Sequence, residues 1–436
     1  MILVFTPKIN NRIRYIFRLL FTDVLGIGVR LTENVNEFKL HDGAKINYSG
    51  HAFGDELFFM SKPFLLETGI KDQEITVFDW EGIKAFFPTS RSATLPFDPF
   101  AASFYLVSRY EEYLPTIHDK HNRFEALESL AFQNNFLHLP LVNIWAEKIK
   151  QLISAKYPEV IFPIKKFSHV PTIDIDNAFA FREKGFMRSI GASLRSLSKF
   201  DFKEFAERAK VILGMQADPY DTYKLLHDLH AKHQLHPVYF FLFAAYGLND
   251  KNVPTRSQRF RYLIKSIADT SDVGIHPSYN SNFKVDKLER EVHGLAKVLN
   301  REITRSRQHF LKLTFPDTYR NLINLDITDD YTMGYASEIG FRASICDSYN
   351  FYDLDLEIET KLRLHPFQVM DATLNFYLQI SPEESIVRIK QIIDEVHKVK
   401  GTFISLWHNE TIAEYKFWKG WSKVYLEMLE YAATKQ

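Results

Sequence analysis

Two carboxylates stand two residues apart where a strand-like apolar run ends. Asp174 and Asp176 close the run that begins near Val170. In a strand, residues i and i+2 lie on one face, so both carboxylates can reach the same cleft. Two negative charges this close are stable only if a cation joins them or one keeps a proton. The pair predicts a metal site with an adjacent general base; the alternative is a solvated turn, which aspartate also favours.

Three histidines follow later strand-like runs. His276 comes after Val273-Gly274-Ile275, His309 lies in an extended segment, and His408 ends an apolar run that starts near Ile404. In barrels of alternating strands and helices, the active site lies at the C-terminal ends of the strands. One such histidine is usually structural, whereas several in the same topological position favour a shared site.

The first 165 residues predict a small α/β domain. Strands are expected at residues 2–5, 29–32, 45–49, 56–61 and 75–78, and helices at residues 11–25, 99–113 and 139–156. This region carries no paired carboxylates or strand-end histidines. We therefore expect a separate domain without a catalytic role, packed near the mouth of the second domain.

From residue 166 to residue 436 the pattern changes to strands that alternate with helices. Strands are expected at residues 238–243, 343–346 and 402–407. Helices are expected at residues 257–270, 285–299, 316–325 and 381–399, and a charged helical stretch at residues 184–213 is interrupted around residues 193–201. Such alternation predicts a barrel or an open parallel sheet.

Composition excludes several classes of function. The chain has 436 residues, and its 54 lysines and arginines balance 54 aspartates and glutamates, so no basic field supports nucleic-acid binding. The single cysteine, Cys346, excludes an internal disulfide and a cysteine-rich zinc module. No signal peptide and no run of about 20 apolar residues is found, so we expect a cytoplasmic protein without an integral membrane segment.

Taken in order, the motifs of residues 168–436 resemble the NodB-homology polysaccharide deacetylases, carbohydrate esterase family four. Thr172-Ile-Asp174-Ile-Asp176 is similar to the first motif of that family, and Leu406-Trp407-His408 is similar to the last. The resemblance implies an irregular (β/α) barrel and one divalent metal ion, with zinc expected. It also implies that Asp174 is the catalytic base, Asp176 a metal ligand and His408 the acid that protonates the leaving group.

The segments between these two motifs match the family's pattern less closely. The family places His-Ser/Thr-x-x-His where this chain has His276-Pro-Ser-Tyr-Asn280, so His276 is an expected ligand and Asn280 stands at the second histidine. An amide oxygen is a weaker zinc ligand than imidazole, and His309 is the alternative that could complete the site.

Further resemblances concern the residues around the base. The resemblance implies that Arg307 or Arg305 orients the base. Asp371 falls where the family has a carboxylate that often holds this arginine; the alternative is a helix N-cap.

Substrate contacts are expected from three residues. Gly340-Phe341-Arg342 looks like a stretch found in a divergent branch of the family that carries an uncharacterised N-terminal domain. We expect Arg342 to contact the substrate, and Trp407 and Tyr279 to stack on sugar rings.

These expectations predict a metal-dependent hydrolase of carbon–nitrogen bonds other than peptide bonds, which removes acetyl groups, chiefly N-acetyl, from a carbohydrate. Two alternatives stay open. One is a non-catalytic carbohydrate-binding or scaffold protein on a degenerate barrel. The other is a hydrolase of a C–N bond in a small molecule.

Overall fold

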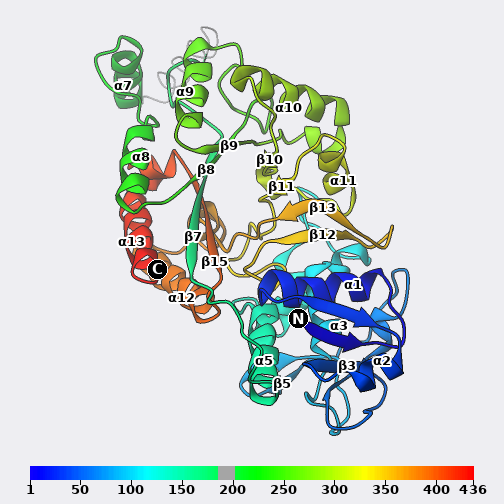
Figure 1. Ribbon diagram of the computed structural model, residues 1–436. Helices are drawn as coiled ribbons and strands as arrows, with labels where there is room; N and C mark the ends of the chain where they lie inside the picture. The colour runs from blue at the N-terminus through cyan, green and yellow to red at the C-terminus, as the bar shows by residue number, and fades with distance from the viewer. Residues whose placement is uncertain (185–201) are drawn as a thin grey trace.

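The computed structural model describes residues 1–184 and 202–436. Figure 1 shows two parts: the N-terminal region, drawn in blue and cyan, and a larger part in which a curved sheet is surrounded by helices. Within these described ranges, no helix is long and apolar enough to cross a membrane.

The N-terminal region is built on a four-stranded parallel sheet. Its strands occur in the order β2-β1-β3-β4, and each neighbouring pair is parallel. The strands are β1 (Ile2–Phe5), β2 (Val29–Thr32), β3 (Lys45–Ser49) and β4 (Leu57–Met60), and a separate antiparallel hairpin consists of β5 (Phe78–Trp80) and β6 (Ile83–Ala85). Strands β1 to β4 match the expected positions because each is a short apolar or alternating run.

Helices cover this sheet. They are α1 (Asn11–Phe17), which continues as the π-helix η1 (Arg18–Val24), then α2 (Val35–Leu40), α3 (Pro99–Val107), α4 (Leu130–Gln133) and α5 (Leu141–Lys156), with short 3₁₀ turns η2 (Pro63–Leu65), η3 (Tyr110–Tyr113) and η4 (Ala126–Glu128). Local caps fix their starts: Asn10 caps α1, and Asp98 caps α3 just before Pro99.

The larger part contains a nine-stranded sheet in the order β12-β13-β11-β10-β9-β8-β7-β15-β14. All neighbours are parallel except β12 and β13. The strands are β7 (Ser168–Ile175), β8 (Val238–Phe241), β9 (Asp272–Ile275), β10 (Arg305–Ser306), β11 (Asp329–Asp330), β12 (Tyr349–Asp353), β13 (Ile358–Leu364), β14 (Val369–Met370) and β15 (Thr402–His408).

Helices connect these strands and lie outside the curved sheet (Figure 1). They are α7 (Phe202–Ile212), α8 (Tyr223–Lys232), α9 (Gln258–Ala268), α10 (Val285–Leu299), α11 (Asp317–Ile323), α12 (Pro382–Lys398) and α13 (Trp421–Ala433), with short turns η5 (Ser281–Phe283), η6 (His309–Leu311), η7 (Thr373–Tyr377), η8 (Thr411–Ala413) and η9 (Lys416–Trp418). Helix α12 begins at Ser381, whose side chain accepts a hydrogen bond from the backbone of Glu384.

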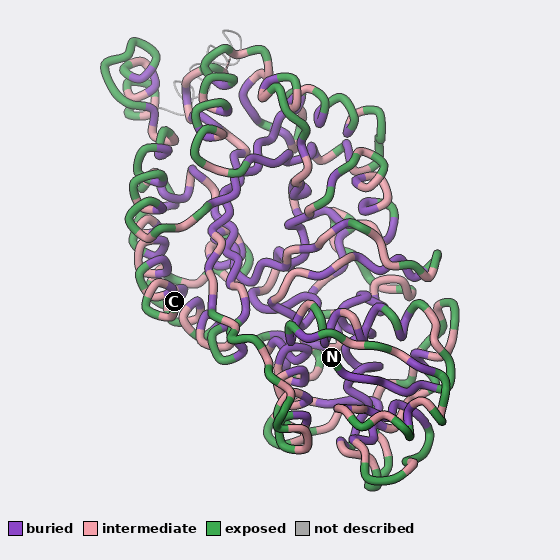
Figure 2. Tube along the Cα trace, in the orientation of Figure 1, coloured by how far each residue is buried: buried purple, intermediate pink, exposed green. Residues whose placement is uncertain are grey.

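The structure shows a mixed α/β fold with parallel sheets, but it does not confirm a closed barrel. In the described part of the chain, β12 and β14 form the two edges of the sheet and are not paired with each other. Figure 2 shows buried chain concentrated along the central strands and in the interior of the N-terminal region.

The two parts are joined by a continuous core and by buried charges. One hydrophobic cluster includes Ile2 and Tyr15 as well as Trp407 and Met428. Glu112 accepts hydrogen bonds from Arg342 (2.9 Å from Nε to Oε1) and from Arg109 (2.7 Å from Nε to Oε1). The N-terminal region therefore does not pack as an independent body.

Gly340 lies at a close approach between the two parts. Its φ angle is +125°, and a Cβ atom there would lie 2.4 Å from the carbonyl oxygen of Leu137. The next residue, Phe341, donates its N–H to that same oxygen at 2.8 Å. Only glycine allows this contact, so the stretch 340–342 is a joint between the two parts.

The strand expected at residues 75–78 lies instead at residues 78–80, and two further segments differ from the expected elements. Residues 343–346 do not form the expected strand; they form a buried turn, because Val142 of α5 donates to the carbonyl of Ser344 and Asn143 accepts from the backbone of Cys346. Of the expected charged helix at residues 184–213, α7 accounts for the end, and residues 185–201 lie outside the described residues.

Candidate active site

The ends of β7 and β15 bring Asp174 and His408 together. The two strands are parallel, and His408 lies opposite Asp174 in their register. Both side chains line a cavity of about 300 Å³ at the C-terminal ends of the strands, together with Asp176, His276 and His309. Parallel strands place their C-terminal ends at one edge, which is why residues 234 positions apart in sequence meet here.

Arg307 binds Asp174 from beneath the cavity. Its Nη1 donates to Asp174 Oδ1 at 2.9 Å, and its Nε donates to the carbonyl of Tyr331 at 2.9 Å. Both side chains are almost completely buried. The guanidinium fixes the direction of the carboxylate. Arg305, the other expected arginine, instead lies 3.2 Å from Asp272 and is partly exposed.

Asp176, His276 and His309 form a group with metal-ligand chemistry. One ligand atom from each lies within 4.8 Å of the others. His276 Nε2 is 3.2 Å from Asp176 Oδ1, and His309 Nε2 is 3.3 Å from Asp176 Oδ2. The Oδ1 atom is buried and has no hydrogen bond of sound geometry among the described residues. Two imidazoles and a carboxylate with a spare oxygen fit a zinc-type site.

The other nitrogen of each histidine is held by a further partner. His276 Nδ1 donates to the carbonyl oxygen of Arg307 at 2.6 Å, which turns Nε2 toward Asp176. His309 Nδ1 lies 3.0 Å from Asp250 Oδ1. Such contacts fix the tautomer and orientation of histidines that ligate metals. The residues present therefore fit a divalent cation.

Electrostatics in this group favour positive charge. Burial opposes a charged imidazole at His309, but the charge of Asp176 and hydrogen bonds to Asp176 and Asp250 raise its pKa to about 9. Burial likewise opposes ionisation of Asp176, yet His309 and His276 hold the pKa of its carboxyl well below the usual value. The space between these side chains thus stabilises a cation, whether a proton or a metal ion.

His408 is oriented by Asp371. The backbone N–H of His408 donates to Asp371 Oδ2 at 2.8 Å, and its Nδ1 lies 2.9 Å from Oδ1. Burial lowers the pKa of His408, but Asp371 outweighs this, with Asp176 and Asp174 adding to the effect, and raises it well above the usual value. The sequence placed Asp371 as a partner of the arginine or as an N-cap; its carboxylate instead holds the histidine.

Asn280 does not join the group. It is exposed at the start of η5 and does not line the cavity. The chain turns after Pro277, because the N–H and hydroxyl of Ser278 donate to buried Glu291. This turn carries Asn280 out to the surface, and His309 stands beside His276 in its place.

The expected substrate contacts are corrected by the structure. Trp407 is fully buried and packs against Tyr425 of α13, because neighbouring strand residues point to opposite faces and His408 takes the cavity face. Arg342 is buried at the joint with Glu112. Tyr279 stands outside the cavity lining and contacts His121 of the N-terminal region.

Several residues that line the cavity or contact its lining were not predicted. Asp250 could not be found from a local pattern, because it lies in a loop that reaches His309 only in the folded chain. Burial raises the pKa of Glu410, against the opposing charge of His408, to about 7. Gln308 is buried in the lining, and its Nε2 has no hydrogen-bond partner among the described residues. Arg123 is contributed by the N-terminal region, which was expected to lie near the mouth of the second domain without a catalytic role.

Comparison with family models gives one match. Residues 2–158 match DUF7033, a family of unknown function. This covers less than half of the chain, and the region it covers is the one that contributes Arg123. A comparison with curated proteins finds no match.

Solved structures include similar folds at low identity. A protein from Mycobacterium smegmatis described as a polysaccharide deacetylase is 13% identical, with 63% of this chain and 86% of that chain covered and a TM-score of 0.41. The polysaccharide deacetylase of Bacillus cereus is 11% identical, covers 61% and 88%, and has a TM-score of 0.29. A CE4-family pseudoenzyme of Bacillus anthracis is 10% identical, covers 61% and 61%, and has a TM-score of 0.30. Likenesses at this level do not establish the chemistry of this chain.

Proposed function

We propose that this protein is a metal-dependent hydrolase that removes the acetyl group from the nitrogen of an N-acetylated sugar. The proposal rests on two oriented side chains beside the metal-ligand residues. The carboxylate of Asp174 is held by Arg307, and the imidazole of His408 is held by Asp371. His276 Nε2 is 3.7 Å from Asp174 Oδ2, and His408 Nε2 is 3.8 Å from Asp176 Oδ2.

The metal site would consist of Asp176, His276 and His309. When bound there, a divalent ion, with zinc favoured by two imidazole ligands, supplies a Lewis acid that polarises the acetyl carbonyl and acidifies water. Asp250 and the carbonyl of Arg307 keep both imidazoles in the ligating tautomer.

Asp174 acts as the general base. Its carboxylate takes a proton from the attacking water, and the hydrogen bond from Arg307 holds it turned toward the cavity. Arg307 is a positioning residue in this scheme, because it contacts the base and not the substrate.

His408 acts as the general acid. An amine leaves an amide only if its nitrogen receives a proton, and the raised pKa of His408 keeps the imidazole protonated at neutral pH. Asp371 holds the ring by Nδ1, which leaves Nε2 to donate the proton toward the leaving nitrogen.

Apolar residues complete the cavity and suit the acetyl methyl group and the face of a sugar ring. They include Leu406, Met370, Phe376 and Trp418. The non-catalytic alternative is less favoured, because a binding protein has no need for an oriented acid and an oriented base.

The test is release of acetate from N-acetylated sugars by the full chain supplied with Zn²⁺. We expect turnover that Asp174→Asn abolishes without loss of zinc or of the folded state, and that Arg305→Ala leaves intact. Retained turnover in Asp174→Asn would rule out this base.

The small volume of the cavity, about 300 Å³, favours a small ligand over a polymer, which leaves a second candidate, a hydrolase of a C–N bond in a small molecule that is not a sugar. Activity on small acyclic or cyclic amides, with none on acetylated sugars, would establish it.

A further inference from the structure

We propose that the N-terminal region forms one wall of the substrate cavity through the rim hairpin, residues 118–124, and that the cavity therefore accepts one N-acetylated sugar ring, free or at a chain end. The chemistry of this ligand rests on the proposed function. The wall itself rests on contacts between the two parts of the chain.

The rim hairpin is rigid by its own bonding. His118 and Phe124 form an antiparallel bridge, and Asn122 takes a left-handed conformation with φ of 59°. The carboxylate of Asp119 accepts the backbone N–H groups of His121 at 2.8 Å and of Arg123 at 2.9 Å. These bonds order the turn before any ligand is present.

Asp119 also directs the side chain of Arg123. Its Oδ2 accepts from Arg123 Nε at 2.7 Å, so the guanidinium has a fixed orientation and a balanced charge. The side chain is 9% exposed, which means that the guanidinium is largely enclosed at the cavity. An arginine neutralised in this way suits uncharged hydroxyl or carbonyl groups better than an anion.

Arg123 binds two residues that line the cavity with it. Its Nη1 donates to the carbonyl of Phe310 at 2.9 Å, and its Nη2 donates to the hydroxyl of Tyr377 at 3.1 Å. Phe310 follows the candidate ligand His309 and has a φ angle of 61°, so Arg123 also holds a conformation that a non-glycine residue rarely adopts.

A second contact fastens the same hairpin. His121 Nδ1 is 3.2 Å from the hydroxyl of Tyr279, and its ring centroid is 4.9 Å from that of Phe310. Tyr279 follows β9, Phe310 follows β10, and Tyr377 ends η7 after the edge strand β14. The rim hairpin therefore reaches across the ends of strands that are far apart in the sheet.

The volume of the cavity bears on the size of the ligand. At about 300 Å³ the cavity is at the small end of small-molecule sites. A cavity at this end of the range suits one small ligand, such as a single N-acetylated sugar ring, better than several linked rings. The interior of a polymer needs room on two sides, and the rim hairpin occupies one of them.

A thiol-labelling experiment tests the wall without any substrate. Ala372 lines the cavity, and the native Cys346 is buried, so Ala372→Cys introduces one reactive thiol into the full chain. We expect a small methanethiosulfonate to label it and a maleimide carrying a polyethylene glycol chain to react slowly. Adding Arg123→Ala should raise the rate with the bulky reagent at least tenfold, and the gentler Tyr377→Phe should raise it less.

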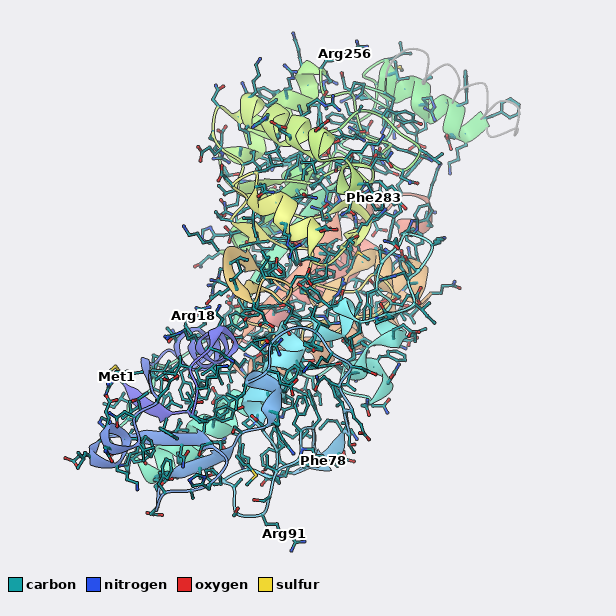
Figure 3. All side chains as sticks on the ribbon, turned by 90° about the vertical axis from the view of Figure 1, so that its right-hand side faces the viewer. Met1, Arg18, Phe78, Arg91, Arg256 and Phe283 are labelled. Carbon is teal, nitrogen blue, oxygen red and sulfur yellow. The ribbon has the colours of Figure 1, made fainter. Side chains whose placement is uncertain are left out.

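The matched control is Arg91→Ala. Arg91 is exposed at the far end of the N-terminal region, away from the curved sheet (Figure 3). If the bulky reagent labels Ala372→Cys at the same rate with and without Arg123→Ala, the rim hairpin does not form a wall of the cavity. This conclusion holds whether or not the protein is a deacetylase.

Chain-length preference tests the ligand. With N-acetylglucosamine and its β-1,4-linked pentamer, Arg123→Ala should lower the ratio of kcat/KM for monomer over pentamer at least tenfold, whereas Arg91→Ala should not change it. If Arg123→Ala leaves this ratio unchanged, the cavity is not limited to a single sugar ring. If the wild-type protein releases no acetate from either sugar, the proposed function fails. The labelling rates still show whether the rim hairpin forms a wall of the cavity.

Discussion

The carboxylate of Asp371 contacts His408 twice, through the backbone N–H at 2.8 Å and through Nδ1 at 2.9 Å. One aspartate thus fixes both the end of β15 and the ring that projects from it. Because Asp371 is fully buried, its charge acts on the imidazole with little screening by water.

This pair predicts a change in the pH profile. Asp371 raises the pKa of His408, so the acid is lost only at high pH in the wild-type protein. In Asp371→Asn we expect the basic limb of the pH profile of kcat to move to lower pH. In His408→Gln we expect kcat to fall by roughly 10²–10⁴-fold. A basic limb that stays in place in Asp371→Asn would contradict the role of the pair.

Metal binding should depend on His309 and not on Asn280. Removal of divalent ions with a chelator should lower the melting temperature, and added Zn²⁺ should restore it, because a ligand that binds only the folded state stabilises it. His309→Ala and Asp176→Ala should abolish this recovery. Asn280→Ala is the matched control, and its zinc affinity, measured by calorimetry, should equal that of the wild-type protein.

Loss of Glu112 should destabilise the whole chain. Its carboxylate lies between Arg109 and Arg342, and burial of all three side chains leaves no water to replace it. We expect Glu112→Gln to lower the free energy of unfolding by about 3–5 kcal/mol. Urea unfolding followed by circular dichroism should still give one transition; separate transitions for the two parts would contradict the continuous core.

Acid should destabilise the protein through two buried histidines. Burial lowers the pKa of His169 to about 3 and that of His230 to about 4, whereas the unfolded chain titrates near 6.5. Both remain neutral in the folded state while the unfolded state binds protons, so stability present above pH 6.5 is lost as the pH falls toward 4.

Each histidine should contribute a slope of about 1.4 kcal/mol per pH unit in that window. Unfolding free energies of His169→Gln and His230→Gln between pH 4 and 6.5 measure it, because each substitution should reduce the slope of the wild-type protein by that amount. A slope identical to that of the wild-type protein would show that the histidine is already charged in the folded state.

Much of the strand framework could be predicted because local sequence patterns indicate each strand. Short apolar runs mark β7, β8 and β15, and the carboxylates and histidines at strand ends are visible without knowing the fold. The helix expected at residues 285–299 agrees with α10, since its apolar residues recur at helical spacing. The parallel arrangement then brings Asp174, His276 and His408 to one edge.

The residues that were missed depend on long-range contacts. Asp250 reaches His309 from a loop, and Arg123 reaches Phe310 across 187 positions of sequence. Arg342 was expected at the substrate, but its carboxylate partner lies 230 residues away. Trp407 is a different case: the alternation of a strand places it on the face opposite His408, so local reasoning could have assigned it to the core.

The joint at Gly340 has a consequence for how the two parts of the chain evolve. A coding sequence that lost its first 158 codons would still encode Arg342, now without the carboxylate that neutralises it, and Phe341 without the carbonyl of Leu137 that its backbone requires. Such a truncated protein would expose to water the apolar side chains that now form one cluster with the N-terminal region. The region matched by DUF7033 and the region that holds the candidate active site are therefore expected to be inherited together, and to be lost together.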